Sequence, residues 1–396
     1  MALEQRLRRI SNSEELVNEL SYKYSRLQSY IQQSTGPSAI PESELMPILS
    51  TIFKYFEDTN ELPLPATAIN TGYTGVLKLG LGNTFVKVDA QSRLNTESDV
   101  YTILNQSSFS DLTPKLKRYS KISIPKTSHT FGVLFLDNLN PKSNPETLTI
   151  LNSNIEYVAR QVLQKHQSDT EDFETDFIEK CRVNPKLYYL SLMALFHSSM
   201  NKSYSKFKLT PYAKLNGKSH YQSSVVPFHE NNRFGIGLLR YKESILDPIL
   251  IRPVGKLRNS IDRYRKAQVK SKTIVHGDFK AENVPFGFLV DHSQVGIGFE
   301  TDDLTYFLID QGIDSIAEMH EYFQDYIKIR NTIDDSFRPE YGKLLTELLP
   351  FSALLHFVLK HSVMEKRDLT NDKHYANRVK YKHNIEKLCA QLNIYH

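Results

Sequence analysis

Residues 273–284 read TIVHGDFKAENV, and residues 288–308 read FLVDHSQVGIGFETDDLTYFL. Each block opens on a short apolar run that predicts a β-strand. The first run leads directly to His276, Gly277 and Asp278, and the second leads to Asp291. Polar side chains at the ends of neighbouring strands can converge on a ligand, so the two blocks predict a binding or catalytic site.

Asp278 is followed five positions later by Asn283, which is the H-x-D-x-x-x-x-N spacing of a phosphoryl-transfer catalytic loop. In that chemistry the Asp accepts the proton of the acceptor hydroxyl. The Asn oxygen and a later Asp, here Asp291, hold Mg²⁺, a hard cation that prefers oxygen ligands. Taken singly, His276 fits a packed, hydrogen-bonded core histidine and Asp291 fits a strand-end cap. The order of the whole segment favours the catalytic interpretation.

With the later pair Asp303-Leu304, the two blocks resemble the core of the aminoglycoside phosphotransferase and choline kinase-like superfamily. Its members are small-molecule kinases with a protein-kinase-like fold. The resemblance implies that Asp278 is the catalytic base and that Asn283 and Asp291 are Mg²⁺ ligands. It also implies that Asp303 is buried and braces the catalytic loop, together with His276.

One feature departs from the family pattern. Asp278 and Asp291 are thirteen positions apart, which is shorter than is usual in the family, so the expected hairpin between them is trimmed to about residues 285–287. His292 and Ser293 also follow Asp291 where many members have an aromatic residue. The assignment of Asp291 therefore depends more on the resemblance than that of Asp278 does.

The segment 68–88 predicts three short strands joined by glycine turns. A turn such as Gly72-Tyr73-Thr74-Gly75 lets backbone N–H groups approach phosphates, although a plain hairpin has the same appearance. Lys87 lies within the apolar run 85–88, where its ammonium group needs a partner. In the kinase-like interpretation Lys87 contacts the nucleotide phosphates.

The expected helix 92–104 supplies that partner. Glu97 is a lone carboxylate on the apolar stripe of this helix, and a buried carboxylate is costly unless it is paired. We therefore predict an ion pair between Lys87 and Glu97. The alternatives are that Glu97 is solvated at the stripe edge and that Asp99 is the partner.

Two more strands, near residues 114–119 and 130–137, complete a small antiparallel sheet. The second resembles the family's hinge, where the backbone of Leu136 to Leu139 contacts the adenine. The chain beyond Pro141 is mostly helical by its apolar periodicity. The predicted class is α+β, a two-lobe protein-kinase-like fold with an N-terminal helical extension. The expected divisions are a helical segment (1–62), a β-rich nucleotide-binding lobe (63–139) and a helical catalytic and acceptor-binding lobe (140–396).

The composition limits the classes of function. A net charge of +4 over 396 residues does not indicate a nucleic-acid partner. No apolar run approaches the length of a membrane span, and the first residues lack the apolar core of a signal peptide. The two cysteines, Cys181 and Cys389, are far apart and lack metal-ligand spacing. These features indicate a cytoplasmic protein without a membrane partner.

The implied activity is ATP- and Mg²⁺-dependent transfer of the γ-phosphoryl group to a hydroxyl of a small-molecule acceptor. The alternative is a catalytically inactive binding or scaffold protein on the same fold, which the shortened hairpin keeps open. A protein kinase is a weaker hypothesis, because HGD replaces HRD and no A-P-E-like segment follows Asp291. The sequence leaves the acceptor open among aminoglycosides, choline, sugars, amino alcohols and lipid-derived alcohols.

Overall fold

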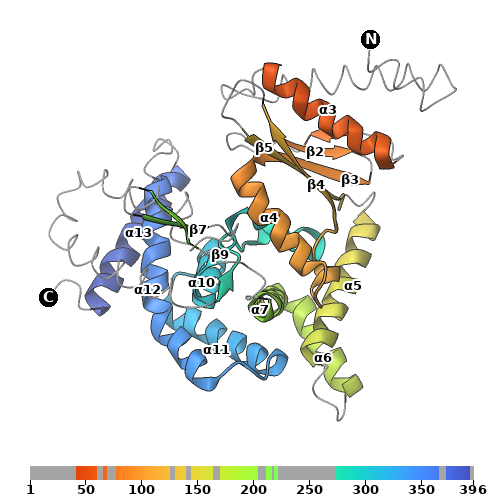
Figure 1. Ribbon diagram of the computed structural model, residues 1–396. Helices are drawn as coiled ribbons and strands as arrows, with labels where there is room; N and C mark the ends of the chain where they lie inside the picture. Colours follow the sequence, from red (N-terminus) through yellow and green to blue (C-terminus); the bar gives the residue numbers. More distant parts are fainter. Residues whose placement is uncertain are drawn as a thin grey trace. The chain divides into compact units, whose positions relative to one another are not determined.

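The computed structural model describes eleven parts of the chain, residues 42–59, 66–68, 77–81, 83–124, 130–139, 144–163, 170–203, 211–215, 218–221, 273–364 and 372–392. Gly72, Gly75 and the segment before residue 42 lie outside these residues. The described chain divides into two compact units. The first contains the described residues up to Thr102 and those from Pro114 to Leu139. The second contains Ile103–Thr113 and the described residues from Asn144 onward (Figure 1).

The first unit is built on a five-stranded antiparallel sheet, as the sequence predicts. Its spatial order is β1 (Ala66–Ala68), β2 (Leu77–Leu81), β3 (Thr84–Ala90), β5 (Thr130–Asp137) and β4 (Leu116–Ser123). The central strands β3 and β5 pair along their whole length, from Thr84 opposite Asp137 to Ala90 opposite Phe131. Successive side chains of a strand point to opposite faces of the sheet. Alternate residues of β3 therefore face the two different sides of this sheet.

Two helices cover the sheet, α3 (Glu42–Thr59) on one face and α4 (Gln91–Leu104) on the other (Figure 1). Ile48 and Ile52 of α3 belong to one buried cluster with Val86 and Val88 of β3. Lys87, between those two valines, points to the opposite face and to α4. The apolar periodicity of the segment after Pro41 therefore reflects packing against the sheet.

The second unit is mainly helical. Its helices are α5 (Asn144–Leu163), α6 (Thr170–Val183), α7 (Pro185–Lys202), α10 (Glu300–Asp310), α11 (Ile316–Ile333), α12 (Pro339–Met364) and α13 (Asp372–Gln391). A strand pair, β6 (Pro211–Leu215) and β7 (Lys218–Tyr221), precedes the block that begins at Thr273. Helix α7 is buried almost all round, from Leu190 to Met200, and packs against α11, while α12 packs against α10 and α13. Residues 274–279, which include the HGD motif, are all buried.

The apolar run 288–290 does not form the predicted strand. The short strand β8 (Ile274–Val275) pairs instead with β9 (Gly296–Ile297), beyond Asp291. Leu289 is fully buried, but its N–H donates to the carbonyl of Leu112 at 2.8 Å rather than to a sheet. The apolar run therefore signals burial and not strand pairing, because a short apolar segment looks alike in both cases.

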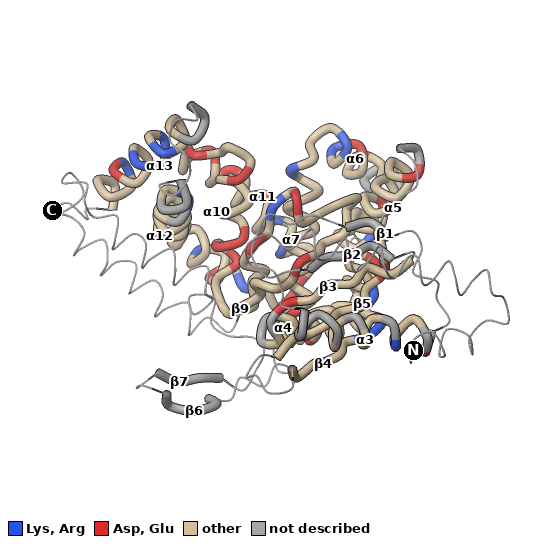
Figure 2. The backbone as a smooth tube through the Cα atoms, turned by 90° about the horizontal axis from the view of Figure 1, so that it is seen from above, with Lys and Arg blue, Asp and Glu red and all other residues tan. Residues whose placement is uncertain are grey.

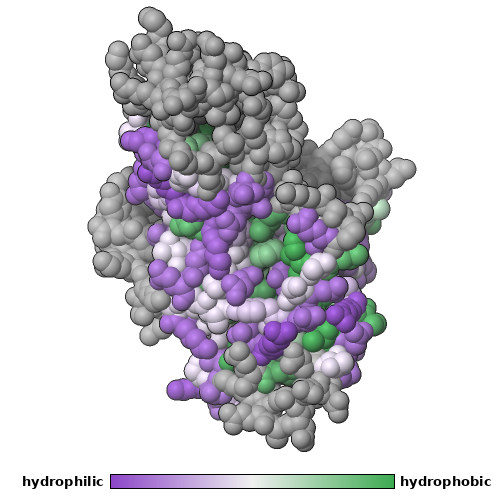
Figure 3. Space-filling model, turned by 90° about the vertical axis from the view of Figure 1, so that its right-hand side faces the viewer, coloured by the Kyte–Doolittle hydropathy of each residue, from purple (hydrophilic) through white to green (hydrophobic). Residues whose placement is uncertain are grey.

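Basic residues (Lys and Arg) and acidic residues (Asp and Glu) both occur at many places along the described chain (Figure 2). Hydrophobic side chains lie among hydrophilic ones on the face drawn in Figure 3. Among the described helices, none is both long enough and apolar enough to cross a membrane.

The packing of α3 on the sheet can be tested with Ile52→Ala. Ile52 is fully buried against the sheet, so the lost burial and the new cavity should lower the unfolding free energy by about 2–4 kcal/mol. Lys54→Ala, at an exposed position of the same helix, is the control and should change it by less than about 0.5 kcal/mol. Calorimetric melting of both variants checks this, and equal melting temperatures would contradict the packing of α3.

Candidate active site

The loop after β8 is fixed by one buried carboxylate. The backbone N–H groups of His276 and Gly277 donate to the two oxygens of Asp303, at 2.6 and 2.7 Å. Asp303 lies in the first turn of α10 and is completely buried. Gly277 has φ of 77°, a left-handed conformation that most side chains disfavour. The short turn that carries Asp278 is therefore tied to the beginning of α10.

Asp303 also binds the side chain of His197 from α7, whose Nε2 lies 2.9 Å from its Oδ2. Burial alone would raise the pKa of the Asp303 carboxyl. The hydrogen bond and charge interaction with His197, together with the backbone hydrogen bond from His276, outweigh burial and hold the pKa below its ordinary value. The carboxylate therefore stays ionised and accepts hydrogen bonds from both the loop and α7.

The polar contacts continue from His197 into α11. His197 Nδ1 lies 2.6 Å from the hydroxyl of Tyr326, and that hydroxyl donates to Glu300 at 2.6 Å. Arg330 donates to both oxygens of Glu300 through Nε and Nη2, at 3.1 Å each. Burial alone would raise the pKa of Glu300, but Arg330, His197 and Tyr326 lower it below its ordinary value. An unbroken chain of contacts thus joins Arg330 to the HGD turn.

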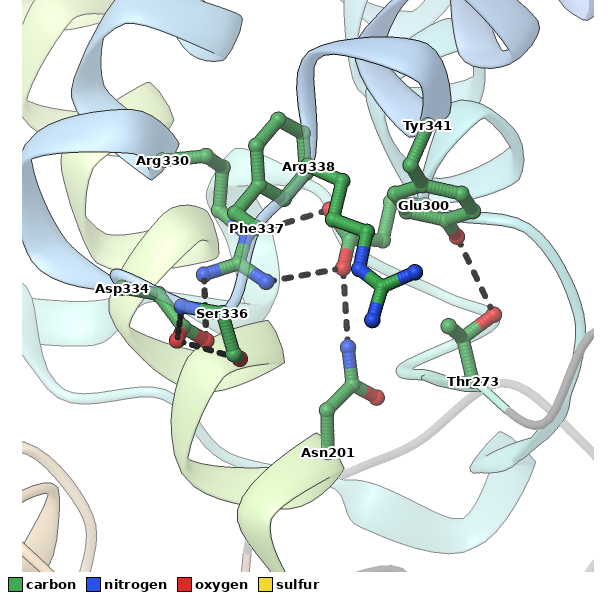
Figure 4. A pocket seen from close by; sticks show the side chains of 9 residues that line it. All are labelled: Asn201, Thr273, Glu300, Arg330, Asp334, Ser336, Phe337, Arg338 and Tyr341. Atoms are coloured by element: carbon green, nitrogen blue, oxygen red, sulfur yellow. Dashed lines mark hydrogen bonds and ion pairs between the residues drawn. The ribbon is translucent and has the colours of Figure 1, made fainter.

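A pocket of about 250 Å³ lies beside this network (Figure 4). Its walls are Asn201, Thr273, Glu300, Arg330, Asp334, Ser336, Phe337, Arg338 and Tyr341. Asn201 donates to Glu300 at 2.8 Å and accepts from the N–H of Ile274 at 3.1 Å, so it joins the network to the start of β8. None of the predicted catalytic or metal-binding residues lines this pocket. The predicted site therefore lies on the loop after β8 and not in the pocket.

Asp278 and Asn283 lie together on the loop. The side-chain amide nitrogen of Asn283 donates to the backbone carbonyl of Asp278 at 2.8 Å and to its carboxylate at 3.2 Å. Both residues are only 8% exposed. The Nζ of Lys280 lies 3.7 Å from the same carboxylate oxygen. Because the amide nitrogen of Asn283 is directed to Asp278, its amide oxygen is the atom that can bind a metal ion or another ligand.

Asp291 is brought back toward this pair by the backbone. The N–H of Val290 donates to the carbonyl of Asn283 at 2.9 Å, which makes the residue before Asp291 a neighbour of Asn283. Asp291 has φ of 60°, and its carboxylate accepts from the hydroxyl of Ser293 at 2.8 Å. Among the described residues, no group of three or more His, Cys, Asp or Glu side chains could hold a metal ion. The predicted ligand set, one amide and one carboxylate, is smaller than such a group.

His276 is a packed ring. It is completely buried, with Phe196 and His292 at ring-centroid distances of 5.6 and 5.2 Å. Burial lowers its pKa, and the neighbouring charges of Asp303, Asp278 and Asp291 oppose that shift only in part. A neutral ring at this depth fits structural support of the loop better than proton transfer.

The first unit contains the predicted ion pair. Lys87 Nζ lies 2.7 Å from the carboxylate of Glu97, and the two residues are 3% and 1% exposed. Asp99, the competing partner in the sequence, is exposed. Of the two hinge residues, Leu136 is buried on β5, while Leu139 is half-buried after the strand ends. The structure thus contains the pair that the apolar stripe of the helix indicates.

The sequence did not reveal the network behind the loop. No motif in the sequence marks Tyr326, Glu300, Arg330 or His197 as partners in one network. The one available signal is the cluster ETDD at residues 300–303, which places three acidic residues at the beginning of an apolar helix. Their separate partners come from helices that are distant in the sequence, so no local pattern identifies them.

The role of Asp303 can be tested by acid unfolding of Asp303→Asn. The substitution leaves buried donors without an ionised acceptor, so it should lower stability at neutral pH by about 3 kcal/mol. A carboxyl with a lowered folded pKa contributes fully above its unfolded pKa of about 3.9, and the contribution falls as pH drops through the folded value. The gap between wild type and variant should therefore narrow below about pH 4.

The measurement is urea unfolding of both proteins across the acid range. Asp325→Asn removes an exposed carboxylate that pairs with Lys328 at 3.1 Å, and it serves as the control. A gap between wild type and Asp303→Asn that stays constant with pH would argue against an ionised Asp303 as the acceptor.

Comparison of the chain with known proteins gave matches among solved structures only. No family model matches the chain, and no curated protein is significantly similar to it in sequence. A thermostable mutant of aminoglycoside phosphotransferase APH(4)-Ia in its apo form matches with 10% identity and a TM-score of 0.44, over 85% of this chain and 97% of that one. The GDP and kanamycin complex of APH(2")-IIIa matches with 12% identity and a TM-score of 0.42, over 87% of this chain and 99% of that one. Both of these solved structures are aminoglycoside phosphotransferases.

Proposed function

We propose that this protein is a phosphotransferase that moves the γ-phosphoryl group of ATP to a hydroxyl of a small molecule. The observation that carries the proposal is the contact between Asn283 and Asp278 on a loop fastened by buried Asp303. It puts the Asp278 carboxylate beside the side-chain amide of Asn283, on a loop with the sequence spacing of a phosphoryl-transfer catalytic loop.

In the proposed reaction the acceptor hydroxyl attacks the γ-phosphorus. The new bond joins the acceptor oxygen to phosphorus, the bond from phosphorus to the bridging oxygen breaks, and ADP leaves. Asp278 receives the hydroxyl proton and orients the attacking oxygen. Lys280, 3.7 Å from Asp278, adds positive charge close to that position. Such transfer depends mainly on positioning and on neutralising charge.

The residues present suit a hard cation. The amide oxygen of Asn283 and the carboxylate of Asp291 would hold Mg²⁺, because it prefers oxygen ligands and often has few from the protein. When bound, Mg²⁺ neutralises negative charge on the phosphates. The direction of the Asn283 amide nitrogen toward Asp278 supports this choice, since it leaves the oxygen for the cation.

Lys87 would bind the nucleotide phosphates. Its ammonium group is buried in an ion pair with Glu97, so its position is fixed before any nucleotide arrives. A buried lysine that is held in place loses little freedom on binding an anion. The Glu97 carboxylate, 2.7 Å from the Lys87 ammonium nitrogen, holds the side chain in this position.

The alternative is a binding or scaffold protein without catalysis. The observation that favours it is the irregular loop before Asp291, which replaces the expected strand. The two hypotheses differ in whether nucleotide binding depends on a divalent cation and whether a phosphoryl group is transferred. The acceptor class follows from a screen of aminoglycosides, choline, sugars and amino alcohols.

A thermal-shift titration tests nucleotide and metal binding together. ATP with Mg²⁺ should raise the melting temperature of the wild type, since a ligand at about 100 times its dissociation constant adds about 2.7 kcal/mol of apparent stability. Asp291→Ala should lose the Mg²⁺-dependent part of the rise. Asp325→Asn, an exposed substitution in α11, should behave as wild type. The absence of any shift for the wild type would refute the proposed nucleotide site.

Asp278→Asn tests the proposed base. The variant keeps the size of the side chain but cannot accept the proton, so the transfer rate should fall by about 10²- to 10⁴-fold. Its ATP-induced thermal shift should persist. The rate is measured as ADP release with the best acceptor of the screen. A variant as active as the wild type would exclude Asp278 as the base.

A further inference from the structure

The shortened connection between Asn283 and Asp291 has an unusual support. It is not part of a sheet, and it forms only short 3₁₀ turns, at Ala281–Asn283 and Pro285–Gly287. Its two ends are joined by the bond from Val290 N–H to the Asn283 carbonyl. In a hairpin, strand pairing would hold the residues between these ends. Here the first half of the connection is held by side chains from other helices.

Two buried side chains bind that first half. Tyr188 of α7 donates its hydroxyl to the carbonyl of Gly287 at 2.7 Å. Asn154 of α5 donates its amide nitrogen to the carbonyl of Phe286 at 2.9 Å. They are 3% and 7% exposed, so water competes little with either bond. Consecutive carbonyls of the connection are thus taken by two separate helices of the same unit.

The backbone at this point adopts conformations that side chains disfavour. Phe286 has φ of 54° and Gly287 has φ of 85°. Left-handed backbone at a bulky residue such as Phe286 persists only where surrounding contacts determine it. A Cβ on Gly287 would lie 2.7 Å from the Tyr188 hydroxyl oxygen and 3.0 Å from the Asn154 amide nitrogen. The connection and its two anchors therefore fit one conformation of the chain.

The second half of the connection has its own anchors. Leu289 donates its N–H to the carbonyl of Leu112 at 2.8 Å, and its carbonyl accepts from the hydroxyl of Thr113 at 3.1 Å. Two residues later the chain reaches Asp291, which is again left-handed, with φ of 60°. Any shift of residues 286 and 287 must be absorbed by the three residues that follow them. The position of the Asp291 carboxylate consequently depends on the anchors of both halves of the connection.

We infer that Tyr188 and Asn154 are positioning residues for Asp291 and set the affinity of the site for a divalent cation. The inference rests on the proposed function, because it presumes that Asp291 binds a metal. The two anchors hold the backbone of this short connection in place, as strand pairing holds the backbone of a longer hairpin. They act through the backbone and touch no reacting atom. Outer-shell partners of metal ligands generally have measurable effects on metal affinity.

The test measures Mn²⁺ binding directly. Mn²⁺ prefers the same oxygen ligands as Mg²⁺, and free Mn²⁺ is counted by electron paramagnetic resonance in the presence of a non-hydrolysable ATP analogue. Tyr188→Phe should weaken Mn²⁺ binding by about tenfold, the lower end of the effect of outer-shell partners. The affinity for the nucleotide without metal should stay unchanged.

Tyr157→Phe is the matched control. Tyr157, on α5, also donates its hydroxyl to a backbone carbonyl at 2.7 Å, that of Ser108, but it does not contact the connection. Asn154→Leu, of similar size and without a donor, is the second variant if Tyr188→Phe folds poorly. Gly287→Ala should weaken Mn²⁺ binding as well. Gly312→Ala should not, because Gly312 has φ of 82° but a Cβ there meets nothing within 4 Å.

The outcomes separate this inference from the proposed function. Weaker Mn²⁺ binding in Tyr188→Phe and Asn154→Leu, with Tyr157→Phe like the wild type, supports the inference. Unchanged Mn²⁺ binding in both anchor variants overturns it and leaves the proposed function standing. Equal weakening in Tyr157→Phe also overturns it, since the effect is then general. A wild type that binds no Mn²⁺ with nucleotide refutes the proposed function and the inference together.

Discussion

The hydrogen bonds from the backbone of His276 and Gly277 to the buried carboxylate of Asp303 are the constraint on which the HGD loop depends. A fully buried, ionised carboxylate is costly unless it is well paired, and this one accepts hydrogen bonds from two backbone N–H groups and contacts the imidazole of His197. The loop and α10 therefore cannot separate without exposing the Asp303 carboxylate to water or leaving it buried without its hydrogen-bond donors. Asp278 lies two residues beyond His276, so its position is set by these bonds to Asp303.

The same requirement extends the network into the helical unit. Glu300 is a second fully buried carboxylate, and Arg330 neutralises it through two hydrogen bonds. Tyr326 connects it to His197, which in turn contacts Asp303, so two buried acids of one helix are linked through the contact between Tyr326 and His197. Buried ion pairs give little net stability compared with apolar packing, but they are strongly destabilising when one partner is lost. Their effect here is to specify how α7, α10 and α11 pack behind the loop.

The two ends of the candidate site are organised differently. Asn283 and Asp278 are joined by a local contact within one loop, and their spacing in the sequence is enough to bring them together. Asp291 depends on distant segments, because a connection without strand pairing needs side-chain anchors such as Tyr188 and Asn154. The shortened connection is therefore compatible with an ordered Asp291, even though the local sequence pattern predicts a strand that does not form.

The sequence by itself determined the features that follow from local spacing and periodicity. The antiparallel strands, the helices and the Lys87–Glu97 pair could be predicted, because alternation along a strand and a stripe along a helix state which side chains face inward. Tertiary structure alone decided what the run 288–290 does and which partners surround Asp303 and Glu300. The physical reason is that burial has the same apolar signature in a strand and in a loop. The partners of a buried charge, such as Arg330, can also come from any helix that packs nearby, and no local pattern encodes that choice.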